Sequence, residues 1–108
     1  MFGMANLRPE DTGVDVLLHA YKDIDLHARH GPRIKAYPGK YTDGRATVFS
    51  VPTRDGVPVE VVGRATVRGK QFRAVVEFIE MNWRPLVLYW YNPDYGQDDL
   101  LADLIQPD

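Results

Sequence analysis

The sequence contains no cysteine, and this absence excludes two kinds of site at once. Neither a disulfide bridge nor a zinc centre built on thiolates can form within the 108 residues. The chain also lacks any apolar run near the roughly 20 residues that span a bilayer. Its first residues, MFGMANLRPED, contain no basic stretch followed by an apolar core, so we expect no secretory signal. These absences favour a protein that acts in the cytoplasm.

The sequence also lacks the short motifs of the best-known catalytic and cofactor sites. It has no glycine-rich phosphate loop, no Gly-x-Ser-x-Gly turn and no His-Glu-x-x-His motif. The spacing of its histidines and carboxylates matches no known zinc or calcium loop. We therefore expect no cofactor and no bound metal, and the sequence favours a non-catalytic protein over an enzyme.

Charge is unevenly distributed along the chain, although its net value is only −2. Residues 27–73 carry ten Lys or Arg side chains and three acidic ones, a net charge of +7. Residues 1–26 have a net charge of −3, and residues 74–108 have −6. A basic middle suits a partner that carries phosphates or acidic side chains. Internal neutralisation, with a basic sheet beside acidic helices, explains the same pattern equally well.

Alternation of apolar and polar residues predicts four or five short strands in the first part of the chain. They occupy residues 14–20, 24–29, 34–37, 46–51 and 57–62, and the second is either a separate strand or a continuation of the first. Turn signals separate them at Gly31-Pro32, Pro38-Gly39, Asp43-Gly44 and Arg54-Asp55-Gly56. We expect residues 1–12 to be a flexible N-terminus and residues 13–108 to form a single α+β domain.

After Gly69 the apolar period changes to steps of three and four, which predicts a long helix. The stripe consists of Phe72, Val75, Val76, Ile79, Trp83, Leu86, Val87 and Trp90. Pro85 removes one helical hydrogen bond and clashes with the carbonyl of Met81, so we predict a kink or two stacked pieces. The alternative is a helix that ends near Asn82, followed by a strand over residues 86–91.

A short amphipathic helix is predicted over residues 97–105, with its leucines and Ile105 on one side. The order of the elements predicts the α+β fold class. The expected architecture is a small antiparallel sheet of four or five strands, with one long kinked helix packed on it and a short C-terminal helix.

Two stretches resemble an uncharacterised family of small bacterial proteins. The family carries a strand like His-Phe-His-Val-x-Tyr-Gly, and later a helix ending in a pattern like Asn-(x)n-Leu-Leu-x-x-Trp. The matching stretches here are residues 25–31, DLHARHG, and residues 79–90, IEMNWRPLVLYW. The first family histidine is Asp25 in this chain, a departure that weighs against a two-histidine site. The resemblance implies a compact α+β module whose helix packs on the sheet through Trp90. It also implies genes that lie near toxin–antitoxin-like or mobile elements.

Two of the three histidines, His27 and His30, lie among basic residues. A histidine can act as a general base near neutral pH, and a neighbouring arginine can stabilise a phosphorane. A metal-independent ribonuclease using His27 or His30 with Arg29 and Arg33 is therefore one hypothesis. Residues three apart in a strand point to opposite faces, which argues against a shared site unless the turn at Gly31 intervenes. We favour the simpler interpretation, a polar strand and turn that supplies basic surface.

Two regions contain candidate binding residues. The basic region mixes Lys and Arg with aromatic residues, as nucleic-acid-binding surfaces do. Residues 89–95 contain four aromatic rings, more than one side of a helix or strand can bury, and exposed rings are typical interface anchors. The candidates are Arg33, Lys35, Lys40, Arg45, Tyr89, Tyr91 and Tyr95.

The leading hypothesis is a small interaction module of bacterial or phage origin that binds a macromolecular partner. It would act as a toxin–antitoxin-like component or as an inhibitor of a host or defence protein. A protein partner is favoured over nucleic acid because the acidic ends of the chain repel phosphates. A homodimer is a further expectation, and the alternatives are the ribonuclease toxin and a structural, self-associating protein.

Overall fold

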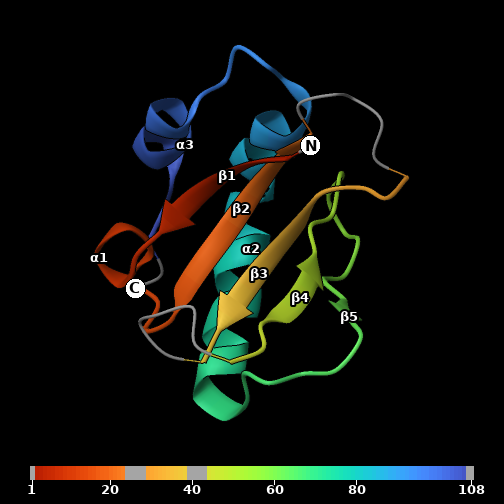
Figure 1. Cartoon of the computed structure of the whole chain (residues 1–108), viewed down its shortest axis with the longest axis vertical. Helices are drawn as coiled ribbons and strands as arrows, with labels where there is room; N and C mark the ends of the chain where they lie inside the picture. Colours follow the sequence, from red (N-terminus) through yellow and green to blue (C-terminus); the bar gives the residue numbers. More distant parts are fainter. Residues whose placement is uncertain (1, 24–28, 39–43, 107–108) are drawn as a thin grey trace.

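The computed structural model of the chain describes residues 2–23, 29–38 and 44–106 (Figure 1). Within these residues the chain forms five strands and three helices. They are β1 (Phe2–Leu7), α1 (Pro9–Thr12), β2 (Leu17–Asp23), β3 (Arg33–Tyr37), β4 (Thr47–Ser50), β5 (Val61–Val62), α2 (Gly69–Tyr91) and α3 (Gln97–Asp103). No helix in this part of the chain is long and apolar enough to cross a membrane.

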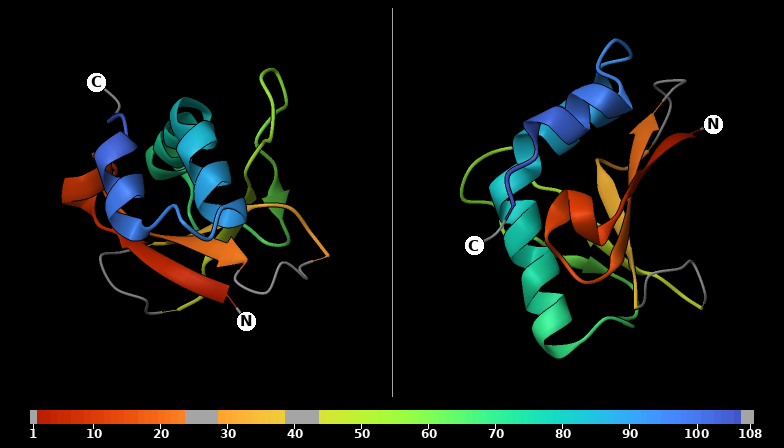
Figure 2. Two further views of the ribbon diagram at one scale, coloured as in Figure 1. Left: turned by 90° about the horizontal axis from the view of Figure 1, so that it is seen from above. Right: turned by 90° about the vertical axis from the view of Figure 1, so that its left-hand side faces the viewer.

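The five strands form one antiparallel sheet in which each strand pairs with its neighbours in sequence. The register places Ala20 opposite Ala5 on one side and Ile34 on the other. Helix α2 lies across one face of the sheet with α3 beside it, as the two views in Figure 2 show. This arrangement confirms the predicted α+β fold, with a five-stranded antiparallel sheet, a long helix packed on it and a short C-terminal helix.

The core lies between the sheet and α2. Side chains alternate between the two faces of a strand, and one set on each strand is buried against the helix. This inner set is Ala5, Leu7, Leu18, Ala20, Ile34, Ala36 and Phe49, which belong to one core cluster with Val75, Phe78, Ile79 and Leu86 of α2. Each buried Leu, Ile or Phe contributes about 1.5–3 kcal/mol to stability.

The other set of side chains points away from α2, and no helix in the described ranges covers it. We call this surface the open face. It consists of Met4, Asn6, Leu17, His19, Tyr21, Asp23, Arg33, Lys35, Tyr37, Val48, Ser50 and Val62. The sheet therefore has one apolar face buried by helices and one face that carries polar, basic and aromatic groups.

Residues 2–12, which the sequence assigned to a flexible N-terminus, contain β1 and α1 in the structure. β1 pairs with β2 along its whole length, and Ala5 and Leu7 are fully buried. Only two residues of β1, Ala5 and Leu7, supply the apolar positions of a strand pattern. They lie beside Gly3 and Asn6, which both disfavour strands, so the sequence does not predict this strand. The Gln106 side chain donates hydrogen bonds to backbone carbonyls of α1 and ties the C-terminal segment to this part of the chain.

The predicted strands over 34–37 and 46–51 are confirmed as β3 and β4, with small shifts at their ends. The strand predicted over 57–62 is reduced to β5, because Pro58 has no N–H to donate to a ladder. The strand predicted over 14–20 begins at Leu17, after an irregular turn, and continues to Asp23. The strand predicted over 24–29 lies almost entirely outside the described residues.

Helix α2 runs through Pro85 to Tyr91, so the alternative strand over 86–91 is wrong and the kinked helix is confirmed. The kink falls at Asn82, where φ is −123° and ψ is 16°. The fully buried Asn82 amide donates to the carbonyl of Phe78 at 3.0 Å and to that of Ile105 at 2.8 Å. It accepts the Ile105 N–H at 2.7 Å. One side chain thus joins the kink to the segment that follows α3.

Lys22 points to the helix side of the sheet and fixes the end of α2. Its ammonium group donates to the carbonyls of Asn92 and Tyr95 and lies 4.6 Å from the ring centroid of Tyr89. A cation is favourable at the carbonyl end of a helix. Asp94 and Asp99 lie close enough to oppose the lowering of the Lys22 pKa that burial causes. The acidic C-terminal region therefore meets a cation on the helix side of the sheet.

Candidate functional site

A pocket of about 210 Å³ lies where the open face meets the end of α2. It is lined by side chains from three strands, from the segment before β3 and from the end of α2. These are Tyr21, His30, Arg33, Lys35, Val48 and Trp90. The pocket combines three aromatic or imidazole rings with two permanent cations.

The register of the sheet explains why these side chains meet. Arg33 and Lys35 are two residues apart on β3, so both point to the open face. Lys35 lies opposite His19 on β2 and opposite Val48 on β4. Tyr21 follows His19 on the same face of β2, which brings its ring beside the Lys35 side chain. The Lys35 ammonium lies 5.4 Å from the centroid of that ring, within cation–π range.

Trp90 and His30 form the end wall of the pocket. Their ring centroids are 5.4 Å apart and their planes are inclined by 37°. Trp90 is almost fully buried in the last turn of α2, whereas His30 is partly exposed. The Nδ1 atom of His30 lies 2.8 Å from the carbonyl oxygen of Gly31, so a proton on Nδ1 is donated to this carbonyl in a hydrogen bond. This wall of the pocket therefore consists of the buried indole ring of Trp90, on the helix, and the partly exposed imidazole ring of His30 that lies against it.

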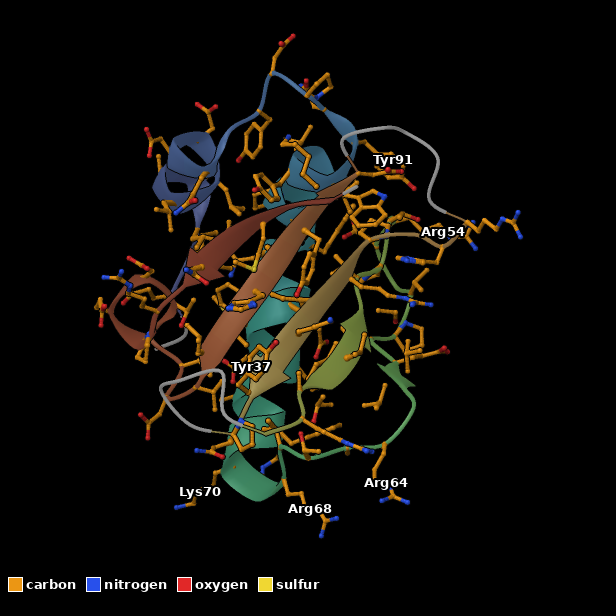
Figure 3. The ribbon with its side chains drawn as sticks, viewed as in Figure 1. Tyr37, Arg54, Arg64, Arg68, Lys70 and Tyr91 are labelled. Carbon is orange, nitrogen blue, oxygen red and sulfur yellow. The ribbon has the colours of Figure 1, made fainter. Side chains whose placement is uncertain are left out.

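An aromatic row continues from the pocket along the open face. The rings of Tyr21 and His19 have centroids 6.4 Å apart, and those of His19 and Tyr37 are 5.0 Å apart, both in edge-to-face geometry. Tyr37, the last residue of β3, is labelled in Figure 3, where it lies toward the lower end of the sheet. Burial, and then the neighbouring Tyr37, raise the pKa of Tyr21 to about 12. The Tyr21 hydroxyl thus keeps its proton at neutral pH and can donate a hydrogen bond.

His19 is the most buried polar group of this row. It is 5% exposed, and its Nε2 atom has no hydrogen-bond partner among the described residues. Burial and the charge of Lys35 lower the pKa of His19 below the usual 6.5. At neutral pH the imidazole is therefore uncharged and packs as a ring between two tyrosines.

This environment makes the stability of the protein depend on pH. The unfolded chain binds a proton at His19 near pH 6.5, whereas the folded chain binds it only at lower pH. The free energy of unfolding should therefore fall as the pH drops below 6.5, because protonation favours the unfolded state. We expect wild type to lose more stability than His19→Leu between about pH 7.5 and pH 5.5, measured by urea unfolding. Equal losses in the two proteins would contradict this assignment.

Three of the residues singled out from the sequence, His30, Arg33 and Lys35, come together in the pocket. Arg29 is exposed just before them and does not line it. Arg45 is exposed beyond β3, near the segment that leads into α2. His27 and Lys40 lie outside the described residues, so the roles suggested for them stay predictions.

The three tyrosines predicted from residues 89–95 lie apart from the pocket. Tyr91 is 51% exposed and points to solvent, as Figure 3 shows. Tyr89 is buried in the core, and the hydroxyl of Tyr95 donates to the carboxylate of Asp103. Burial and the Asp103 carboxylate raise the pKa of Tyr95. The C-terminal helix thus covers part of this aromatic segment.

Sequence reasoning missed three lining residues, Tyr21, Val48 and Trp90. Tyr21 is two residues after His19 in the same strand, so the two side chains point to the same face. This spacing is the sequence signal that could have placed Tyr21 on the open face. Trp90 was placed in the apolar stripe of the helix and, through the family resemblance, at the contact with the sheet, but nothing in the sequence places the end of α2 beside β2 and β3. Across the described ranges, no three His, Asp or Glu side chains gather where they could hold a metal ion.

A second basic cluster lies at the opposite end of the molecule. Arg64, Arg68 and Lys70 project from the start of α2 and the segment before it, as Figure 3 shows. All three side chains are exposed. They line none of the three pockets described for this part of the chain. This cluster therefore serves as a matched control for the cations of the open face.

No family model matches the sequence, and neither a curated protein nor a solved structure is similar enough to the chain to count as a match. The resemblance to an uncharacterised bacterial family stays a prediction. Most of its first motif falls within residues 24–28, outside the described part of the chain.

Proposed function

We propose that the protein is a non-catalytic interaction module that binds an anionic macromolecular partner on its open face. The observation that carries this proposal is the pocket in which Arg33 and Lys35 lie beside aromatic rings. Its volume of about 210 Å³ is smaller than the roughly 300–1,000 Å³ of most small-molecule sites. A pocket of this size suits one protruding group of a larger partner.

The arrangement of charge supports the same proposal. The acidic helix α3 lies on the helix side of the sheet, while Arg33 and Lys35 lie on the other side (Figures 1 and 2). The acidic charges of α3 are thus separated from Arg33 and Lys35 by the thickness of the sheet. A positive surface of this kind attracts anionic partners and speeds their association.

The proposal includes the setting that the sequence resemblance implies. A cytoplasmic toxin–antitoxin-like component, or an inhibitor of a host or defence protein, acts by occupying a surface, which needs no catalytic group. A non-catalytic interaction module of this kind includes proteins that bind a protein partner and proteins that self-associate.

A ribonuclease is the second candidate, because His30 shares the pocket with Arg33. Such an enzyme needs a general base and a general acid. His19 is buried in the aromatic row and does not line the pocket, so His30 would serve both roles unless His27 contributes. Incubation of the protein with labelled RNA tests this candidate. We expect intact RNA, and cleavage that is lost in His30→Ala would favour the enzyme.

Retention on heparin, a polyanion, tests the proposed binding surface. The open-face variant combines Arg33→Gln with Lys35→Gln, and the end variant combines Arg64→Gln with Arg68→Gln. Both remove two positive charges, so any difference between them reports position. We expect the open-face variant to elute at clearly lower salt than the end variant, since its charges lie in the binding surface. Equal elution of the two variants, or a larger loss in the end variant, would rule out the open face.

A further inference from the structure

We propose that the partner is single-stranded nucleic acid and that the pocket is the subsite for one of its nucleotides. This inference rests on the proposed function. The base would lie against the rings of Tyr21 and His30, and its phosphates would pair with Arg33 and Lys35. Stacking of unpaired bases on aromatic side chains beside cations is how many proteins recognise single strands.

The sequence favoured a protein partner because the acidic ends of the chain repel phosphates. The structure weakens this reason for the open face. Asp94 and Asp99 interact with Lys22, whose ammonium group lies on the helix side of the sheet. Charges on the far side of the molecule are largely screened beyond about 8–10 Å at physiological salt. At the pocket, a phosphate therefore meets Arg33 and Lys35, while Asp23, the acidic residue of the open face, is buried at the end of β2.

The kinds of side chain on the open face also favour nucleic acid over protein as the partner. A protein interface usually centres on apolar or aromatic anchors that fill fully desolvated pockets. The exposed apolar side chains of the open face are Met4, at 45%, and Val62, at 38%. They lie on β1 and β5, the two edges of the sheet, opposite the lining residues Tyr21 and Val48, and neither lines the pocket itself. The centre of the face is instead a mixture of rings and cations.

The aromatic row gives a path for more than one base. Tyr21, His19 and Tyr37 follow each other across β2 and β3, with centroid steps of 6.4 and 5.0 Å. Tyr21 and Tyr37 are partly exposed, whereas His19 is covered between them. A strand that enters at the pocket can therefore continue to Tyr37, which supplies a second ring. The pocket fixes one nucleotide, and the row supports its neighbour.

Fluorescence anisotropy with labelled oligouridylate and oligothymidylate of about 15 nucleotides tests the inference. Two contacts to a single strand predict a slope of about −1.4 for log K against log salt, measured between about 50 and 200 mM. We expect the open-face variant to lose most of this slope and to bind at least about tenfold more weakly. The end variant should keep both the slope and the affinity. Comparison of the affinities for oligouridylate and oligothymidylate shows whether the protein prefers RNA or DNA.

Substitutions of Tyr21 distinguish the contribution of base stacking to binding from the contribution of charge. Tyr21→Leu should weaken binding by about 5- to 100-fold, the usual cost of losing one stacked base, whereas Tyr21→Phe should bind like wild type. Circular dichroism and urea unfolding identify any variant that has lost its fold, and Tyr21→Phe carries the test if Tyr21→Leu unfolds. In that case a phenylalanine variant that binds like wild type supports the ring contact, and one that loses binding overturns it.

The failure of this inference is distinguishable from failure of the proposed function. If wild type binds neither oligonucleotide below about 100 μM, while heparin retention still depends on Arg33 and Lys35, the partner is an acidic protein and the inference is wrong. If the end variant loses as much oligonucleotide affinity as the open-face variant, attraction is general and the pocket is not a subsite. If heparin retention is also independent of Arg33 and Lys35, both proposals fail.

Discussion

Replacing Asn82 with alanine is expected to lower the free energy of unfolding by about 2–4 kcal/mol. The amide of Asn82 makes three hydrogen bonds, two of them to the backbone N–H and carbonyl of Ile105. A buried backbone group that loses its partner costs about 1–3 kcal/mol, and the partial exposure of Ile105 lets water replace part of this loss. Urea unfolding at neutral pH measures the change.

Arg84→Ala is the matched control, two residues further along the same helix. Its guanidinium pairs with Asp55 at 3.2 Å, but both side chains are more than two-thirds exposed, at 71% and 78%. An exposed pair of this kind contributes at most about 1 kcal/mol. A loss in Asn82→Ala no larger than in Arg84→Ala would show that the Asn82 amide does not hold the kink to the C-terminal segment.

Thr47→Val is expected to cost about 2–3 kcal/mol, although it preserves the shape of the side chain. The fully buried Thr47 hydroxyl accepts the backbone N–H groups of Thr66, at 2.6 Å, and Val67, at 2.8 Å. The Thr66 hydroxyl donates to the carbonyl of Arg45, so the remaining bond runs from the Thr47 hydroxyl to Thr66 Oγ1. Valine would leave two N–H groups without an acceptor, and the free energy from urea unfolding reports this cost.

Thr47→Ser supplies the control for that experiment. It keeps the hydroxyl and removes only one methyl group, which costs about 1 kcal/mol. We therefore expect serine to destabilise the protein less than valine, the opposite of the order that side-chain hydrophobicity predicts. If valine is tolerated better than serine, the hydroxyl network between β4 and the start of α2 does not stabilise the fold.

The sequence predicts the fold well where its periodicity is strong. The apolar stripe with three- and four-residue steps continues through Pro85, and α2 follows it to Tyr91. The position of the kink could not be derived, because it depends on Asn82 meeting Ile105, a contact between segments 23 residues apart. β1 was missed for the related reason that its stability comes from pairing with β2 and from the burial of Ala5 and Leu7, not from strand propensity.

The candidate site shows the same division between local and long-range information. Two-residue alternation places Arg33 and Lys35 on one face of β3, and the sequence identifies both as candidate binding residues. Which residues face them depends on strand order and register, which bring in Tyr21 and Val48. The end of α2 contributes Trp90 from more than 50 positions away, and no local pattern could predict that contact.

The central claim is that the open face, at the pocket beside Trp90, is the binding surface. The chain has two tryptophans, and Trp83 lines a separate pocket with the loop after β4, so it acts as an internal control. Nuclear magnetic resonance of the two indole N–H groups during titration with oligouridylate tests the claim directly. We expect the Trp90 signal to shift and saturate while the Trp83 signal stays in place. Binding that moves Trp83 and leaves Trp90 unchanged would contradict it.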